Sequence, residues 1–133
     1  MKILVDTSVW IDFFNDVSSL PKIALHNLLQ AEEDICISDY ILTETLQGFK
    51  DDKEFEAAKR HLLNFPIYRL KVPESYIHAA QIYRACRKKG LTIRKTADCL
   101  IAQAAIESCL FLLHNDNDFD RIASICNLRI LPT

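Results

Sequence analysis

The sequence predicts an α/β fold in which a short, mainly parallel sheet lies between two layers of helices. Short apolar runs, which are typical of fully buried strands, alternate with longer segments whose apolar residues recur at helical spacing. Each strand is therefore separated from the next by a helical crossover, the connection that parallel strands require. Because the helical segments outweigh the strands, we expect helices on both faces of the sheet, a three-layer α/β/α architecture.

The first part of the chain supplies two strands and three helices. Residues 2–5 are a short apolar run that predicts a buried strand, and residues 8–14 predict a first helix. Residues 21–32 have mostly helical spacing and a proline suited to a first turn. Residues 35–37 predict a second strand. Residues 40–48 predict a helix, because serine and aspartate precede it as capping residues and a glycine stands at its end.

The middle of the chain continues the alternation. Residues 52–63 form an amphipathic helical pattern that a proline interrupts, and residues 67–71 predict a third strand. Residues 74–89 predict a helix whose basic end, followed by Gly90, is a common C-terminal stop.

The C-terminal part predicts two helices and two strands. They lie at residues 97–108 (helix), 110–113 (strand), 118–125 (helix) and 129–131 (a candidate edge strand). No repeat, linker or low-complexity segment interrupts the pattern. We therefore expect a single domain over residues 1–133, a usual domain length.

Composition limits the classes of protein to consider. Half of the residues are hydrophobic, 26% are charged, and the formal net charge is −2. The apolar runs are shorter than the roughly 20 residues of a membrane helix, and the start lacks the pattern of a signal peptide, so we expect a cytoplasmic protein without a membrane partner. Non-specific nucleic-acid binders are usually basic. A nucleic-acid ligand would need metal ions or a local basic patch, and residues 84–95 offer either such a patch or simply a solvated helix end.

Five cysteines carry no sign of a disulfide framework or a zinc site. Their number is odd, no pair has C-x-x-C spacing, and all have apolar neighbours. We expect five buried thiols: Cys36, Cys86, Cys99, Cys109 and Cys126.

Four acidic residues are expected to meet at one edge of the sheet. Asp6 directly follows the first strand, and Glu44 lies about one turn into the helix after the second. Asp98 lies in the first turn of the helix before the fourth strand, and Asp116 follows that strand. In a parallel sheet the helix N-termini gather at the carboxyl ends of the strands, where ligands of such folds bind. The four carboxylates should therefore share one crevice.

A shared crevice of carboxylates favours a divalent cation. Two carboxylates at ~4 Å repel by about 4 kcal/mol at an effective dielectric constant of 20. Mg²⁺ or Mn²⁺ takes oxygen ligands, and such an ion suits phosphodiester hydrolysis. Taken singly, each acid also has a simpler interpretation: Asp6 and Asp98 as helix caps, Glu44 as a solvent-facing residue, and Asp116 as a turn residue.

Two other patterns in the sequence do not indicate a calcium site or a histidine metal site. The run from Asp116 to Asp120 begins like a calcium loop, but Arg121 and Asn127 stand where an EF-hand needs glycine and glutamate. The four histidines lack metal spacing, and only His114 is a candidate for supporting the Asp116 turn.

Four segments resemble the motifs of the PIN-domain family, and within it the VapC-like toxins of bacterial toxin–antitoxin pairs. The resemblance spans nearly the whole chain and keeps the order of the motifs. The segments are Leu4–Asp12 around Asp6, Leu42–Gly48 around Glu44, Arg94–Ala102 around Asp98, and Leu112–Ile122 around Asp116. One departure is Asn115, where relatives often carry Ser or Thr, and Asp118 is an alternative to Asp116 as the fourth acid.

The resemblance implies a PIN-like fold and a Mg²⁺- or Mn²⁺-dependent endoribonuclease. The catalytic acids would be Asp6, Glu44, Asp98 and Asp116. Asp6 and Asp98 would be direct metal ligands, and Glu44 and Asp116 would complete the site or hold a second ion. We expect hydrolysis that leaves a 3′-hydroxyl and a 5′-phosphate. Thr7 and Ser8 would bond the Asp6 carboxylate or phosphate, and Arg94 and Lys95 would steady the RNA backbone beside Asp98.

The resemblance also implies partners: an RNA substrate, a cognate antitoxin whose tail fills the acidic groove, and a second copy of the chain. Trp10, Phe13 and Phe14 are either part of the antitoxin-docking surface or simply core. Two alternatives to the toxin ribonuclease stay open, a catalytically silent PIN-like binding module and a metal-dependent DNA nuclease.

Overall fold

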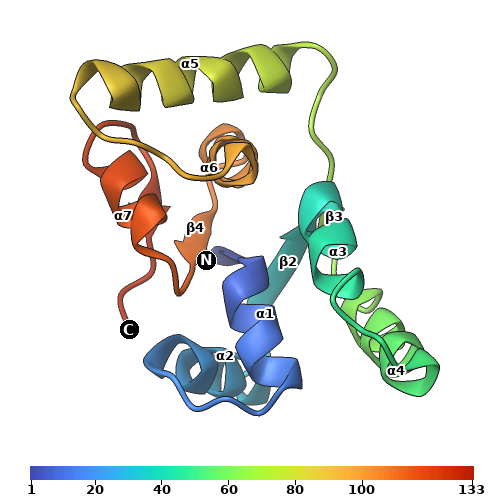
Figure 1. Cartoon of the computed structure of the whole chain (residues 1–133). Coiled ribbons are helices and arrows are strands. Elements are labelled where there is room, and N and C mark those ends of the chain that lie inside the picture. Colours follow the sequence, from blue (N-terminus) through green and yellow to red (C-terminus); the bar gives the residue numbers. More distant parts are fainter.

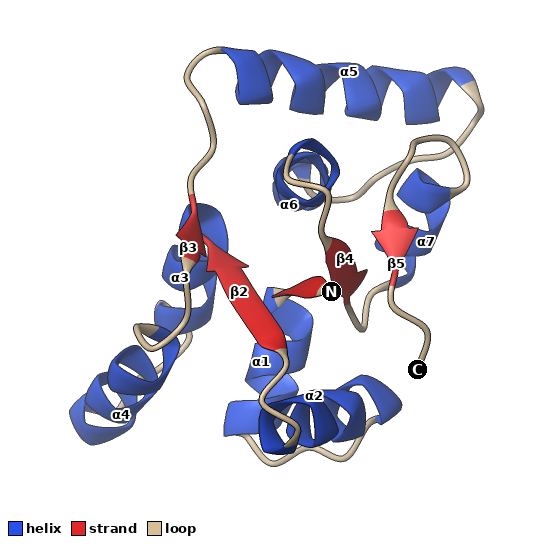
Figure 2. Ribbon diagram, turned by 180° about the vertical axis from the view of Figure 1, so that it is seen from behind, coloured by secondary structure: helices blue, strands red, loops and turns tan.

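The computed structural model describes all residues, 1–133, and contains one five-stranded sheet. Its strands pair in the order β3-β2-β1-β4-β5, and all four pairings are parallel (Figure 2). The strands are β1 (Lys2–Val5), β2 (Asp34–Ser38), β3 (Ile67–Tyr68), β4 (Phe111–Leu113) and β5 (Arg129–Ile130). The predicted α/β class with a short parallel sheet is confirmed.

Seven helices connect the strands. They are α1 (Thr7–Phe14), α2 (Leu20–Gln30), α3 (Asp39–Leu46), α4 (Asp52–Leu62), α5 (Glu74–Lys88), α6 (Thr96–Glu107) and α7 (Asn117–Ala123). Every predicted helix is present, with ends that differ by no more than two residues. None of the seven has the combination of length and apolar surface that crossing a bilayer requires.

The helices form two layers around the sheet. Helices α5, α6 and α7 contact one another, whereas α1 contacts α2 and α3, and α3 contacts α4. Figure 1 shows α5 running across one end of the molecule beside α6 and α7, with α2 on the opposite side and α4 at the periphery. This arrangement follows from strand order, because the crossovers from β1 through β2 to β3 run in one direction along the sheet and those to β4 and β5 run in the other.

The predicted third strand, 67–71, was too long. Only two of its residues pair with β2, through Ile37–Ile67 and Ser38–Tyr68. Beyond them the backbone N–H of Leu70 donates to the Asp39 side chain, and that of Lys71 donates to Ser75 Oγ at 2.8 Å. Side-chain acceptors therefore replace the strand partner, and the chain leaves the sheet toward α5.

One hydrophobic cluster of 27 buried residues fills both faces of the sheet. The expectation of five buried thiols was wrong for two of them: Cys36, Cys86 and Cys99 are buried, but Cys109 is exposed and Cys126 is half-buried. Cys109 lies in the turn between α6 and β4 with φ of +54°, and such turns lie at the surface. Gly90 follows α5 with φ of +77°, which turns the chain from this helix toward α6.

Sheet register brings distant residues to one edge. β1 pairs with β4 through Val5 and Leu113, and the backbone N–H of Asp6 then donates to the carbonyl of Leu113 at 2.9 Å. The chain after β1 and the chain after β4 therefore begin side by side, although they are more than a hundred residues apart in sequence.

Candidate metal centre

The four predicted acids line one cavity of about 360 Å³ at the carboxyl edge of the sheet. Asp6 comes from the end of β1, Glu44 from α3, Asp98 from the first turn of α6, and Asp116 from the turn before α7. The other residues of the wall are Thr7, Ser8, Ile11, Gln47, Gly48 and Lys95. The structure thus brings together every acid that the sequence placed at this edge.

Asp6 is buried and held by the residue two positions later. It is the N-cap of α1, and its Oδ2 accepts from the backbone N–H of Ser8 at 3.0 Å and from the Ser8 hydroxyl at 2.5 Å. Burial raises the pKa of Asp6 and outweighs these hydrogen bonds, and the negative charge of Glu44 raises it further. The capping interpretation is thus correct, but it does not account for a carboxylate that is only 4% exposed beside other acids.

Glu44 is oriented by Thr7. The Thr7 hydroxyl donates to Glu44 Oε1, which joins the start of α1 to α3. The sequence had paired Thr7 with Asp6 or phosphate, whereas in the structure Ser8 takes the Asp6 contact and Thr7 takes the Glu44 contact. Two adjacent hydroxyl residues therefore each position one acid of the cavity.

Asp98 is the acid of the site whose carboxylate has the fewest hydrogen-bond partners. It is 5% exposed, and its Oδ2 is buried without any hydrogen-bond partner. Burial raises the pKa of Asp98 to about 7, with further contributions from the charges of Asp116, Asp6 and Asp118 and a smaller opposing one from Lys95. An orphaned carboxylate oxygen among other carboxylates is costly unless a cation accompanies it.

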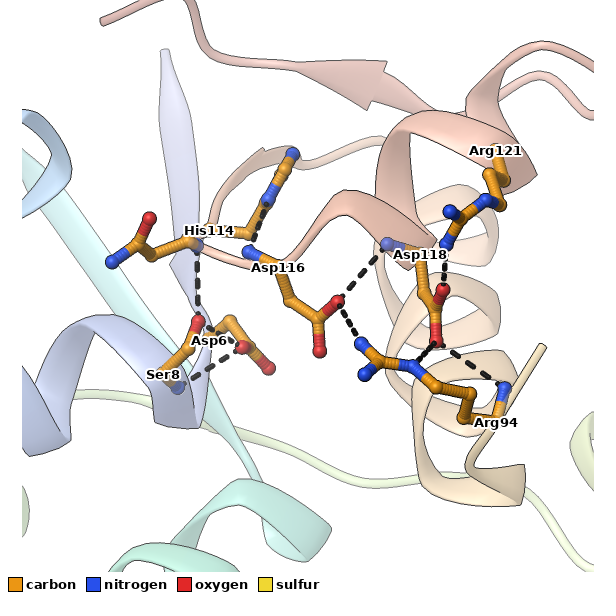
Figure 3. Close-up of polar contacts among 8 residues, drawn as sticks. Asp6, Ser8, Arg94, His114, Asp116, Asp118 and Arg121 are labelled. Carbon is orange, nitrogen blue, oxygen red and sulfur yellow. Dashed lines mark hydrogen bonds and ion pairs between the residues drawn. The ribbon is translucent and has the colours of Figure 1, made fainter.

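Asp116 and Asp118 lie close together but have different environments. Asp118 is fully buried, and both of its oxygens hold arginine groups: Arg121 contacts Oδ1, and the backbone and side chain of Arg94 contact Oδ2 at 3.2 Å each (Figure 3). Burial alone would raise the pKa of Asp118, but these hydrogen bonds and the Arg94 charge lower it. Asp116 lines the acidic cavity, while Asp118 does not.

Three of these carboxylates meet the distance requirement for a shared ion. Asp98, Asp116 and Asp118 each bring one oxygen within 4.8 Å of the others. Two arginines already contact the carboxylate oxygens of Asp118, however, so Asp98 and Asp116 are the better metal ligands. Together with Asp6 and Glu44 they give an oxygen-only donor set, which fits Mg²⁺ or Mn²⁺ and lacks the nitrogen and sulfur ligands typical of zinc.

The two basic residues before α6 separate to different places. Lys95 lines the acidic cavity beside Asp98. Arg94 reaches the turn before α7, where its Nη2 donates to Asp116 Oδ1 at 3.2 Å (Figure 3). That Arg94 and Lys95 steady the RNA backbone beside Asp98 stays a prediction.

Hydrogen bonds between α1 and the turn that carries Asp116 were not predicted from the sequence. Asp12, to which the sequence analysis gave no functional role, accepts through Oδ2 from Asn115 Nδ2 at 2.9 Å and from the Ser19 hydroxyl at 3.0 Å. The backbone N–H of Asn115 donates to Ser8 Oγ at 3.0 Å. The signal was present, because Ser8 and Asp12 are four residues apart on one helix face and Asn115 is where the fourth motif departs from relatives.

His114 supports the same turn from the other side. Its Nδ1 accepts from the backbone N–H of Asp116 at 3.1 Å, and its Nε2 lies 3.1 Å from Asp120 Oδ1. The ring also packs on Phe119, with centroids 5.2 Å apart. Because Nδ1 acts as an acceptor, the proton of the neutral ring belongs on Nε2.

Trp10 belongs to the core and not to a docking surface. It is 0% exposed and packs against the rings of Phe13, Phe14, His61 and Phe65 at centroid distances of 5.5–5.8 Å. Phe13 and Phe14 are half-buried in the same cluster. For Trp10 the choice between core and antitoxin surface is thereby decided.

Comparison with known proteins gives a family for this arrangement. The sequence model of the PIN-domain family matches residues 3–125 of this chain. A VapC ribonuclease of Mycobacterium bovis is 37% identical over 128 residues, which are 96% of each chain, and ribonuclease VapC11 of Mycobacterium tuberculosis has the same identity and coverage.

Solved structures of lower identity share the fold. The chain superimposes on VapBC2 from Rickettsia felis, solved bound to a promoter DNA fragment, with a TM-score of 0.76 and 22% identity over 98% of both chains. It also resembles VapC20 of Mycobacterium tuberculosis, described as a sarcin–ricin loop cleaving toxin, with a TM-score of 0.69 and 16% identity over 96% of this chain and 99% of that one. With four acids at the carboxyl edge of a 3-2-1-4-5 parallel sheet and a family match over 123 of its 133 residues, from 3 to 125, the chain belongs to the PIN-domain family.

Proposed function

We propose that this chain is a divalent-metal-dependent endoribonuclease that acts as the toxin of a toxin–antitoxin pair. The observation that carries the proposal is the orphaned Oδ2 of Asp98, buried in a cavity that three further acids line. A carboxylate in this position is stable when a cation neutralises it, and phosphodiester hydrolysis is the chemistry that such a cation supports.

The metal-holding residues would be Asp6 and Asp98, with Glu44 and Asp116 completing the set. A bound Mg²⁺ or Mn²⁺ would supply positive charge for the phosphate oxygens and would acidify a coordinated water. Ser8 and Thr7 keep the Asp6 and Glu44 carboxylates in place, so the donor oxygens need little rearrangement on metal binding. Lys95, on the wall beside Asp98, offers a cation to an RNA phosphate.

The curated relatives support the choice of RNA as substrate and of an antitoxin as partner. Two of them carry the name VapC ribonuclease or ribonuclease VapC11 at 37% identity, and several solved relatives are toxin–antitoxin complexes. We propose that residues 1–133 act as one PIN domain, that the protein pairs with a cognate antitoxin and forms a homodimer, and that it works in the cytoplasm, where its RNA substrate lies.

Cleavage of total cellular RNA tests this function. The purified, antitoxin-free protein is incubated with total RNA in Mg²⁺, Mn²⁺ or EDTA, and the new 5′ ends are sequenced. We expect discrete cuts that need the metal, carry a 5′-phosphate and disappear in Asp98→Asn. A matched control is Asp34→Asn, which removes an exposed acid at the start of β2, on the opposite edge of the sheet.

Metal binding by itself is a separate readout. Calorimetric titration with Mn²⁺ should give binding to the wild type and to Asp34→Asn, and at least tenfold weaker binding to Asp98→Asn. Metal binding without cleavage of any RNA would favour a silent binding module, and cleavage of DNA alone would favour a DNA nuclease. Full RNA cleavage by Asp98→Asn would refute the assignment of Asp98 as a metal ligand of the active site.

A further inference from the structure

A second cavity adjoins the acidic one and has a different chemical character. It measures about 720 Å³ and lies between the chain that leads into α6 and the turn and first residues of α7. Its wall consists of Gly90, Leu91, Thr92, Arg94, Asn115, Asp116, Asn117 and Arg121. Asp116 lines both cavities, so an extended ligand can occupy both at once.

The wall of this second cavity is rich in hydrogen-bond donors. Two guanidinium groups, two side-chain amides and one hydroxyl line it, against a single carboxylate and a single hydrophobic side chain. A cavity with this composition suits an oxyanion that accepts several hydrogen bonds, and it suits neither an apolar ligand nor a cation.

A buried carboxylate fixes the two arginines in place. Asp118 is 0% exposed, and its two oxygens contact the side chains of Arg94 and Arg121 on either side (Figure 3). The side chains of these arginines nevertheless remain 67% and 45% exposed. One buried negative charge thus orients two positive ones, and one of these, Arg94, also pairs with Asp116 at 3.2 Å.

Both guanidinium groups keep donors for a ligand. Arg94 uses its Nε and Nη2 for Asp118 and Asp116, and Arg121 uses only Nη1 for Asp118. Nη1 of Arg94 and both Nε and Nη2 of Arg121 have no protein acceptor. A pair of pre-oriented guanidinium groups with free donors is a favourable arrangement for phosphate, because the orientation has been fixed before binding.

We propose that this second cavity is a subsite for an RNA phosphate next to the scissile one, with Arg94 and Arg121 as its ligands and Asp118 as their positioning residue. This subsite rests on the proposed function. It also defines the direction in which the RNA strand enters or leaves the acidic cavity. The strand enters or leaves the acidic cavity past Asp116 and places a neighbouring phosphate between the two arginines. Arg121, which lies in the fourth motif but had been given no role from the sequence, becomes a substrate-binding residue.

The test measures RNA binding without catalysis. An RNA oligonucleotide that spans the cut mapped in total RNA is labelled, and its affinity is measured in EDTA at several salt concentrations. We expect Arg121→Gln to weaken binding about three- to tenfold and to reduce the slope of log affinity against log salt by about 0.7, the value for one lost contact to single-stranded RNA. The matched control is Arg60→Gln on α4, an exposed arginine without an ion pair, which should change neither quantity.

Neutral linkages in the RNA locate the contact independently of the fold of any variant. Methylphosphonates replace the phosphates around the cut one at a time. We expect one substitution beside the cut to weaken binding to the wild type, and to weaken binding to Arg121→Gln less, because only the Arg94 contact remains to be lost there. Equal effects of every linkage on both proteins, or wild-type affinity and salt slope in Arg121→Gln, would overturn the subsite and leave the arginines with a structural or antitoxin-binding role. If the protein cuts no RNA at all, the proposed function fails together with the subsite. If it cuts RNA but Arg121→Gln binds RNA like the wild type, only the subsite is refuted.

Discussion

The Ser8 hydroxyl joins the first acidic motif to the fourth. It donates to Asp6 Oδ2 at 2.5 Å and accepts from the backbone N–H of Asn115 at 3.0 Å, across 107 positions of sequence. This one oxygen therefore fixes both a buried carboxylate of the cavity and the start of the turn that carries Asp116.

Replacing Ser8 by Ala should weaken metal binding more than it weakens the fold. Asp6 would keep the backbone N–H of Ser8 but lose its hydroxyl donor, and Asn115 would lose its acceptor. Loss of such a supporting contact typically costs 10–100-fold in metal affinity or activity. Mn²⁺ titration and the RNA assay measure this effect, and Ser18→Ala, an exposed serine in the loop after α1, is the control. An unchanged metal affinity in Ser8→Ala would show that Asp6 needs no support.

The metal-free protein should lose stability as the pH rises toward 8, and Asp98 should be the cause. Its pKa is about 7 in the folded protein against 3.8 for an ordinary aspartate. Because the folded state then binds the proton more tightly than the unfolded one, this contribution is complete below about pH 4 and is lost as the pH passes about 7. Between about pH 5 and pH 8 the loss amounts to about 2–3 kcal/mol in the free energy of unfolding.

Urea unfolding in EDTA at these two pH values measures the loss, with Asp98→Asn as the comparison. The variant lacks the titrating group, so its stability should depend less on pH. Added Mg²⁺ should restore the wild type at about pH 8, by about 2.7 kcal/mol at a hundredfold excess over the dissociation constant, and should have little effect on Asp98→Asn. Equal pH dependence of both proteins would contradict the raised pKa of Asp98.

Asp116 and Asp118 should separate into a functional and a structural residue. Asp118→Asn removes the charge that two arginines share, and we expect a loss of about 2–3 kcal/mol in the free energy of unfolding. Asp116→Asn keeps an amide oxygen that can still cap α7, so its stability should change little while RNA cleavage is lost. Thermal unfolding and the RNA assay together separate the two effects. A stable but inactive Asp118→Asn beside an active Asp116→Asn would reverse the assignment.

Trp10 should behave as a core residue and as a reporter of unfolding. It is the only tryptophan of the chain and is 0% exposed. Trp10→Ala should lower the free energy of unfolding by about 3–5 kcal/mol, because it opens a cavity among aromatic rings, while Trp10→Phe should stay folded and retain metal-dependent cleavage. The fluorescence of the wild type should shift to longer wavelength on unfolding in urea. Tyr76→Ala, at a side chain on α5 that is 46% exposed, should change stability by no more than about 0.5 kcal/mol.

The order of the helices and strands and the meeting of the four acids could be predicted from the amino-acid sequence. Short apolar runs that alternate with helical periods favour a covered parallel sheet, and in such a sheet the ends of β1 and β4 and the start of α6 share an edge. That rule places Asp6, Glu44, Asp98 and Asp116 at the edge, because each lies within about a turn of a strand end or a helix start. The resemblance to the PIN-domain motifs distinguished them from other acids in the same elements, and Asp118 stayed an alternative to Asp116. The length of β3 did not follow, since side chains of Asp39 and Ser75 take over its backbone donors.

The partner of each polar residue around the acids could not be predicted from the sequence and depends on how the elements pack. Thr7 and Ser8 are adjacent in sequence, yet the helical rotation between them directs one to Glu44 and the other to Asp6. Arg94 and Lys95 are also adjacent, and the chain entering α6 places them on two different cavities. Asp118 looks like a metal ligand in sequence and holds two arginines in space, because long side chains from α7 and from the chain before α6 reach it first. Such choices depend on long-range packing, which local sequence patterns do not encode.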